Sequence, residues 1–161
     1  MPRGEAKATQ SISGKVAIPT SVSDAPVDAV RSRIMRSVST RNSGPELSVR
    51  RALHGAGLRF RLHVQSLPGT PDIVLPAKRT VVFVHGCFWH RHEGCRYASS
   101  PKTRQEFWSA KFEKNVARDK ANKQALHALG WRVVEVWECD VKKDRFLEPL
   151  LNALKADRER G

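Results

Sequence analysis

The sequence lacks any apolar run close to the roughly 20 residues that a membrane-spanning helix needs, so we expect no spanning segment. Acidic residues are also scarce, because 16 Asp and Glu face 29 Lys and Arg and leave a formal charge of +13. This imbalance favours a polyanionic partner, and nucleic acid is a better candidate than a membrane surface. The alternative is solvated charge scattered over the surface without a specific partner.

The sequence also contains few cysteines. Three cysteines cannot all pair with one another, and no secretory signal precedes them. A reduced cytoplasmic setting fits this count, and there clustered cysteine and histidine bind metal more often than they form disulfides.

The length of 161 residues suffices for one domain with its own core, and no internal repeat is visible. We expect residues 1–24 to be a disordered leader, because they are rich in Ala, Ser, Thr and Lys and show no periodicity. Residues 25–161 are then the single domain. It would begin with a basic helix over residues 26–38, whose dense arginines favour contact with phosphates over a merely solvated face.

Hydrophobic periodicity predicts an α/β protein whose elements follow in the order α-α-β-β-β-α-β-α. The strands near residues 58–62, 73–75 and 80–84 are joined by short turns and should form a meander. After the first helix, the predicted helices and the last strand cover residues 45–56, 103–129, 131–137 and 146–154. Capping boxes are predicted where the S/T-x-x-E spacing occurs, at Ser43 with Glu46 and at Thr103 with Glu106.

Residues 80–95 are the most informative stretch, because an apolar, mostly β-branched run passes into a loop rich in histidine, cysteine and aromatic residues. A strand that ends in such a loop presents polar groups at one edge of a sheet, where α/β proteins usually build their sites. The loop therefore predicts the functional centre of the chain.

A closed metal site is the most specific chemistry in this loop. Cys87 and Cys95 lie close together, and Cys139 ends the last predicted strand, which could return beside them. Three thiolates and one imidazole would form a tetrahedral zinc site of the structural kind. Buried free cysteines are the weaker alternative. Spacing alone does not choose the fourth ligand among the loop histidines His85, His90 and His92.

A second candidate site joins Asp72 to the histidines near His85. A hard divalent ion needs carboxylate oxygens, and phosphodiester hydrolysis needs both a cation and a base. Histidine suits the base, because its ordinary pKa is about 6.5. An aspartate that follows a proline, as Asp72 follows Pro71, is also common in plain turns, which is the alternative.

Residues 31–141 resemble the very-short-patch-repair (Vsr) DNA mismatch endonucleases. The matching motifs are P-G-T-P-D at 68–72, F-V-H-G-C-F-W-H-R-H-x-x-C at 83–95, F-W at 107–108 and G-W-R-V-V-E-V-W-E-C at 130–139. The resemblance implies a restriction-endonuclease-like core, which is a mixed β-sheet flanked by helices, with a structural zinc site. It also implies an enzyme that nicks one strand 5′ to the thymine of a T·G mismatch left by deaminated 5-methylcytosine.

The resemblance implies a role for each matching residue. Asp72 would bind the catalytic magnesium ion and Glu46 would support the waters of that ion, which favours this role over the capping box alone. His85 and His90 would act on the attacking water or the phosphate, one of them as general base. The implied zinc ligands are Cys87, His92, Cys95 and Cys139, and the implied aromatic wedge consists of Phe88, Trp89 and Trp108.

The implied partner is double-stranded DNA with a T·G mismatch, with other mismatch-repair proteins as further partners. A monomer in the bacterial cytoplasm, close to the nucleoid and away from membranes, is expected. Restriction-type nucleases usually carry an acidic-x-Lys triplet after the metal aspartate, whereas residues 82–85 are Val, Phe, Val and His. Two other classes stay open, a restriction endonuclease-like nuclease and a zinc-stabilised DNA-binding module without catalysis.

Overall fold

The computed structural model describes residues 29, 33 and 41–156, and residues Ser39–Gly161 form one compact unit. The leader predicted for residues 1–24 lies outside the described residues. So does most of the helix predicted for residues 26–38, of which Ala29 and Arg33 are described as helical and exposed. The division into a leader and one domain stays a prediction.

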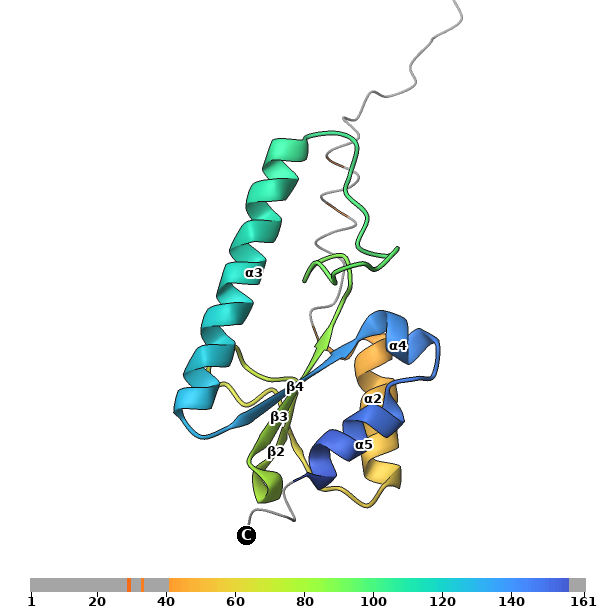
Figure 1. Ribbon diagram of the computed structural model, residues 1–161, viewed down its shortest axis with the longest axis vertical. Coiled ribbons are helices and arrows are strands. Elements are labelled where there is room, and N and C mark those ends of the chain that lie inside the picture. The colour runs from red at the N-terminus through yellow and green to blue at the C-terminus, as the bar shows by residue number, and fades with distance from the viewer. Residues whose placement is uncertain (1–28, 30–32, 34–40, 157–161) are drawn as a thin grey trace, which may run out of the picture. The chain divides into compact units, whose positions relative to one another are not determined.

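A four-stranded mixed sheet with the strand order β1–β2–β3–β4 forms the centre of the unit (Figure 1). The first three strands pair antiparallel, which confirms the predicted meander, and β4 runs parallel to β3. A parallel neighbour requires a long crossover connection, and the longest helix of the unit supplies it. The strands are β1 (Arg61–Leu62), β2 (Ile73–Leu75), β3 (Thr80–His85) and β4 (Arg132–Trp137).

Helices cover both faces of this sheet, so the predicted mixed α/β architecture is confirmed. The crossover helix α3 lies along one face, and α2, α4 and α5 lie on the other (Figure 1). The helices are α2 (Gly44–Gly55), α3 (Gln105–Ala128), α4 (Glu138–Lys142) and α5 (Leu147–Lys155), with the 3₁₀ turn η1 (Pro76–Lys78) before β3.

Alternation along the strands divides the core between the two faces. Ile73 and Val82 point toward α2 and α5, whereas Val74 and Val81 point toward α3. Each fully buried side chain of this kind contributes roughly 1.5–3 kcal/mol. The larger cluster consists of Val49, Leu53, Ile73, Leu75, Val82, Val136, Phe146, Leu150 and Leu154.

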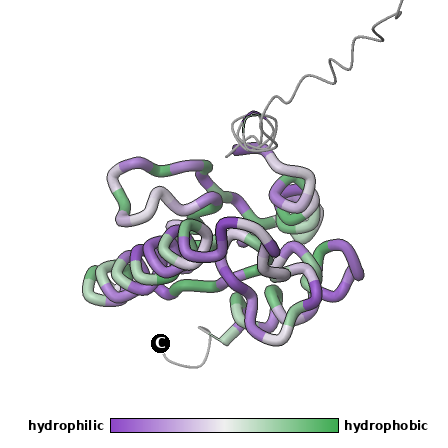
Figure 2. The backbone as a smooth tube through the Cα atoms, turned by 90° about the horizontal axis from the view of Figure 1, so that it is seen from above, coloured by the Kyte–Doolittle hydropathy of each residue, from purple (hydrophilic) through white to green (hydrophobic). Residues whose placement is uncertain are grey.

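Much of α3 is not part of this core. Of its described side chains only Trp108, Phe112 and Leu126 are buried, and hydrophilic and hydrophobic residues are interspersed along the helices in Figure 2. The outer surface of α3 is therefore available to a partner.

The two predicted capping boxes have different outcomes. At α2 the Ser43 hydroxyl accepts from the Glu46 amide and the Glu46 carboxylate accepts from the Ser43 amide, so this box is confirmed. At α3 the prediction for Thr103 and Glu106 is wrong. The N-cap is Arg104, in the left-handed region at φ 52°, so Glu106 lies one position too early to close a box.

Two further details differ from the sequence-based expectations, and a third agrees with them. The first strand is shorter than predicted, while Leu58 and Phe60 still pack against the core. The short helix α4 was not predicted, because five residues are too few for a periodic pattern. Helix α5 carries Pro149 in its first turn, as expected, where its missing amide hydrogen costs no helical bond.

Within the described residues, no helix has the length and apolar character needed to span a membrane.

Candidate functional site

Three clusters of metal-binding residue types lie around β3, the strand that leads into residues 85–95. We call them the acidic cluster (Glu46, His63 and Asp72), the histidine cluster (His85, His90 and Asp119) and the cysteine cluster (Cys87, His92, Cys95 and Cys139). Within each cluster the potential ligand atoms lie within 4.8 Å of one another. The loop after β3 contributes to two of them.

Strand pairing builds the acidic cluster. Asp72 lies just before β2, and its Oδ2 accepts a hydrogen bond of 2.8 Å from the amide of Val84 on the neighbouring strand β3. His63 follows β1, and its amide donates to the Asp72 carbonyl at 3.3 Å, which continues the antiparallel register. Glu46 reaches the cluster from the first turn of α2 and is only 2 % exposed.

The acidic cluster favours a positive charge. Burial raises the pKa of Asp72, and the nearby Glu46 carboxylate raises it further, although the Val84 amide, His63 and Arg50 partly oppose this. A buried and a half-buried carboxylate this close repel each other unless a cation or a proton lies between them. The donor set of two carboxylates and one imidazole fits a divalent ion.

The histidine cluster consists of two parallel imidazoles and one carboxylate. The rings of His85 and His90 stack with their centroids 3.9 Å apart and an interplanar angle of 3°. His90 Nδ1 lies 2.5 Å from Asp119 Oδ2 on α3. A carboxylate in this position holds the proton on Nδ1 and leaves Nε2 free to accept a proton.

Burial makes His85 a neutral side chain at physiological pH. Burial and the neighbouring His90 lower the pKa of His85 to about 3, against the opposing charge of Asp119. Its Nδ1 is buried and lies 3.8 Å from Glu135 Oε1, too far for a hydrogen bond, and no other partner of this atom is found among the described residues. A neutral imidazole beside a phosphate can act as a base or a hydrogen-bond partner.

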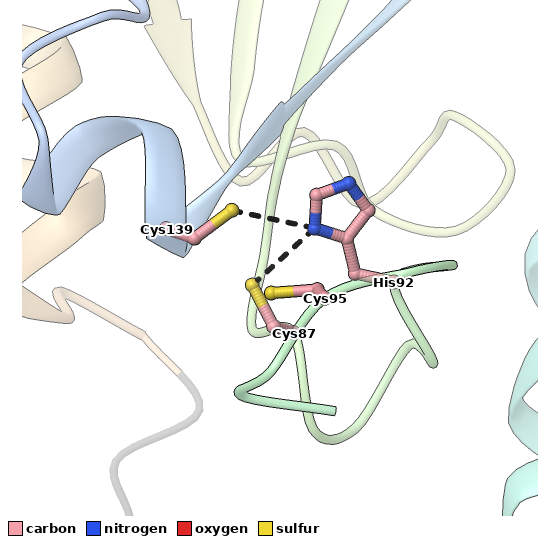
Figure 3. A group of neighbouring side chains, drawn as sticks. All are labelled: Cys87, His92, Cys95 and Cys139. Atoms are coloured by element: carbon pink, nitrogen blue, oxygen red, sulfur yellow. Dashed lines mark hydrogen bonds between the residues drawn. The ribbon is translucent and has the colours of Figure 1, made fainter. Parts of the chain in front are cut away.

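In the cysteine cluster, three sulfur atoms gather beside the His92 ring (Figure 3). His92 Nδ1 lies 3.3 Å from Cys139 Sγ and 3.7 Å from Cys87 Sγ. Cys139 lies in the first turn of α4, and a Trp137 ring stacked at 4.1 Å fixes the His92 imidazole. The set of three thiols and one imidazole matches a closed tetrahedral zinc site.

Burial disfavours the thiolate form at two of the three cysteines of this cluster. All three are free thiols, and burial raises the pKa of Cys87 to about 12 and also raises that of Cys139. Protonated thiols are weak hydrogen-bond donors, whereas zinc binds them as thiolates and deprotonates them outright. The donor set therefore fits zinc better than a structural role for buried thiols.

The three predicted wedge residues lie together beside these clusters. The rings of Phe88 and Trp89 meet edge to face at 5.1 Å, and Phe88 contacts Trp108 at 5.7 Å and Phe112 at 5.1 Å. The sequence suggested an exposed Phe88–Trp89 pair, but both side chains are only half-exposed, and Trp108 is 9 % exposed. The pair therefore packs against α3, in the loop segment that directly precedes His90 of the histidine cluster.

Cations surround these rings. The Lys111 ammonium lies between 5.4 and 5.9 Å from the ring centroids of Trp89, Trp108 and Phe107. Exposed Lys114 and Arg118 add further positive charge on the side of α3 that carries Lys111, and Lys120 adds positive charge on the opposite side. Positive charge next to flat aromatic faces is typical of surfaces that bind nucleic acid.

The structure brings the four predicted zinc ligands together, but it divides the predicted hydrolytic residues between two clusters, with Asp72 and Glu46 in one and His85 and His90 in the other. It does not test their roles, which stay predictions. Two members of the clusters were missed, His63 and Asp119. Pairing residue 62 with residue 73 would have placed His63 beside Asp72. No local sequence pattern indicates that Asp119 lies on the side of α3 that faces His90.

Comparison with known protein families matches residues 23–96 to the family described as "DNA mismatch endonuclease Vsr". The chain is 52 % identical over 121 residues to "Type II nicking enzyme V.XorIIP" of Xanthomonas oryzae. The aligned residues cover 75 % of this chain and 88 % of that protein. It is 47 % identical over 114 residues to "DNA mismatch endonuclease Vsr" of Escherichia coli, covering 71 % and 72 % of the two chains. "Type II nicking enzyme V.NmeAIP" of Neisseria meningitidis is 40 % identical over 124 residues, with coverage of 77 % and 88 %.

Proposed function

Because the chain belongs to the Vsr family of DNA mismatch endonucleases, we propose that it nicks one strand of a duplex 5′ to the thymine of a T·G mismatch. The family makes it a DNA endonuclease that acts on mismatched DNA. The mismatch would arise by deamination of 5-methylcytosine. We propose that it works as a monomer in the bacterial cytoplasm, close to the nucleoid and alongside other mismatch-repair proteins.

One observation carries this proposal. Phe88 and Trp89 lie in the loop between His85, the last residue of β3, and His90, so the rings are tethered within a few residues of the candidate hydrolytic groups. Unstacking a base step costs a few kcal/mol, and it costs least where pairing is already weak. An inserted aromatic pair would therefore select a T·G wobble and place the neighbouring phosphate at the histidines.

Each cluster would have its own part in the reaction. Asp72 would hold the catalytic magnesium ion, which would neutralise charge that develops on the phosphate, and Glu46 would support the waters of that ion. His85 and His90 would orient the attacking water or take its proton, with Asp119 holding the ring of His90. Cys87, His92, Cys95 and Cys139 would hold a structural zinc ion, and thereby fix the loop that carries the rings and histidines.

The proposal is tested by incubating the protein with duplexes that carry T·G, another mismatch or none, with magnesium or with EDTA. We expect a single nick 5′ to the thymine, only in the T·G duplex and only with magnesium. Cleavage of the matched duplex at a fixed sequence would instead indicate a restriction-type nuclease. Binding without cleavage under every condition would indicate a DNA-binding module.

Asp119→Asn is expected to slow nicking, because the amide cannot hold the His90 imidazolium as a carboxylate does. Burial raises the pKa of Asp119, but the hydrogen bond and charge of His90 outweigh it and leave this pKa below its ordinary value, so the carboxylate is ionised at neutral pH. The loss should be smaller than the roughly 10²–10⁴-fold loss expected for His90→Ala. Single-turnover nicking rates on a T·G duplex measure the loss in both variants. An unchanged rate for Asp119→Asn would show that Asp119 takes no part in the reaction.

Trp89→Ala is expected to reduce the discrimination between T·G and T·A duplexes more than it reduces total DNA affinity. The ring would act only where a base step opens, whereas the lysines of α3 would contribute affinity to any duplex, with strong salt dependence. Both dissociation constants are measured at one fixed salt concentration. Trp89→Phe keeps an aromatic ring and should retain most of the discrimination, and an unchanged ratio in Trp89→Ala would place mismatch recognition elsewhere.

A further inference from the structure

His63 has no part in the reaction proposed above, yet its imidazole lies between the two carboxylates of the acidic cluster. Its Nε2 is 3.0 Å from Glu46 Oε1, and its Nδ1 is 3.9 Å from Asp72 Oδ1. The side chain is only 15 % exposed. Its backbone lies in the left-handed region at φ 47°, and the hydrogen bond to the Asp72 carbonyl holds it there.

Arg50 occupies the same space. The Arg50 guanidinium donates from Nη2 to Glu46 Oε1, and the same Nη2 lies 2.8 Å from His63 Nε2. A further hydrogen bond of 2.7 Å joins its Nη1 to Asn42 Oδ1. The guanidinium thus already places a positive charge between Glu46 and His63.

These contacts do not satisfy one another. Arginine only donates hydrogen bonds, so the contact with Arg50 requires His63 Nε2 as an acceptor, and this nitrogen then faces a second acceptor, Glu46 Oε1, at 3.0 Å. A protonated Nε2 would donate to Glu46 but could not accept from Arg50. In addition, Arg50 Nε is buried, and no hydrogen-bond partner of this atom is found among the described residues.

We propose that His63 and Glu46 both bind the divalent ion of the acidic cluster directly, together with Asp72, and that the ion displaces the Arg50 guanidinium when it binds. This inference rests on the proposed function for the ion at Asp72. An unprotonated imidazole nitrogen and two carboxylates are all ligands of one positive ion, so the conflict at His63 Nε2 disappears. The separation of 3.0 Å between His63 Nε2 and Glu46 Oε1 is that of neighbouring ligands with bonds of about 2.1 Å.

The nitrogen ligand sets the class of ion. Magnesium binds through one or two carboxylates and keeps several waters, whereas imidazole favours first-row transition ions. The site with His63 should therefore bind Mn²⁺ more tightly than Mg²⁺, while still taking Mg²⁺ through its oxygens. A site made of Asp72 and Glu46 alone would show much less of this preference.

The test measures Mn²⁺ binding to the DNA-free, zinc-containing full chain at neutral pH, by electron paramagnetic resonance, with Mg²⁺ as competitor. His63→Asn removes the nitrogen ligand while asparagine tolerates the left-handed backbone. It should weaken Mn²⁺ binding by at least roughly tenfold and reduce the preference for Mn²⁺ over Mg²⁺. The exposed His54 on α2 offers the matched control, and His54→Asn should change neither quantity.

Arg50→Met tests the displacement, because it keeps the apolar stem and removes the charge. Mn²⁺ should bind more tightly to this variant than to the wild type, whereas Arg51→Met, at an exposed neighbour on the same helix, should bind as the wild type does. Unchanged or weaker binding in Arg50→Met would overturn the displacement.

Two further results decide whether the ion lies at this site. Asp72→Asn should abolish Mn²⁺ binding and Asp119→Asn should leave it intact. If instead Asp119→Asn removes the ion and His63→Asn does not, the ion binds the histidine cluster and the inference is wrong. Because no DNA is present, these outcomes are independent of whether the protein nicks a T·G duplex.

Discussion

Replacing Asp72 with asparagine is expected to abolish nicking of a T·G duplex while leaving DNA binding largely intact. The amide keeps the shape of the side chain and its hydrogen bond from the Val84 amide, but it removes the charge that would hold the catalytic cation. The loss should equal or exceed the roughly 10²–10⁴-fold effect of a lost acid or base. Single-turnover nicking and a binding titration on the same duplex separate the two effects.

Asp144→Asn is the matched control for this substitution. Asp144 is exposed and has a positive φ of 52°, which asparagine tolerates, so the fold and the nicking rate should be unchanged. Nicking by Asp72→Asn at the rate of the wild type would show that the cation is held elsewhere.

Replacing Cys139 with alanine is expected to release zinc and unfold the catalytic end of the protein. Structural zinc sites contribute an apparent binding free energy on the order of 10 kcal/mol, which is comparable to the total stability of about 5–15 kcal/mol of a typical domain. Soluble yield, metal content and the thermal unfolding midpoint should therefore all fall together. Metal analysis of the purified wild type should find one zinc per chain.

Cys139→His provides the control, because histidine is itself a common zinc ligand. Part of the zinc content and of the thermal stability should return in this variant. A zinc-free wild type, or a Cys139→Ala protein as stable as the wild type, would show that the cysteine cluster is not a metal site.

The parts of the fold that depend on local sequence were predictable. The capping box of Ser43 and Glu46 joins groups that are only three residues apart, and strand β3 is visible in the sequence as a short apolar run. The grouping of Cys87, Cys95 and Cys139 was predictable because cysteine is rare in the chain and two of the three lie close together. The choice of His92 among the loop histidines came only from the resemblance to the Vsr family.

The parts that depend on strand register or helix rotation were not predictable. His63 looked like the outward residue of an alternating strand, and only the pairing of β1 with β2 turns it toward Asp72. Asp119 lies in the middle of α3, where residues on several faces are charged. The failed box at Thr103 follows from the left-handed backbone of Arg104, a conformation that is unusual for this residue type.

The distance in sequence between the two halves of the cysteine cluster affects how the chain folds. His92 and Cys139 are 47 residues apart, with all of α3 between them, whereas α2, α3 and the β2–β3 pair close through contacts between near neighbours. Closing a long loop lowers the conformational entropy of the chain before the contacts that stabilise the closed loop have formed. We therefore expect α2, α3 and the β2–β3 pair to form first. The cysteine cluster should form last, after β4 has joined the sheet.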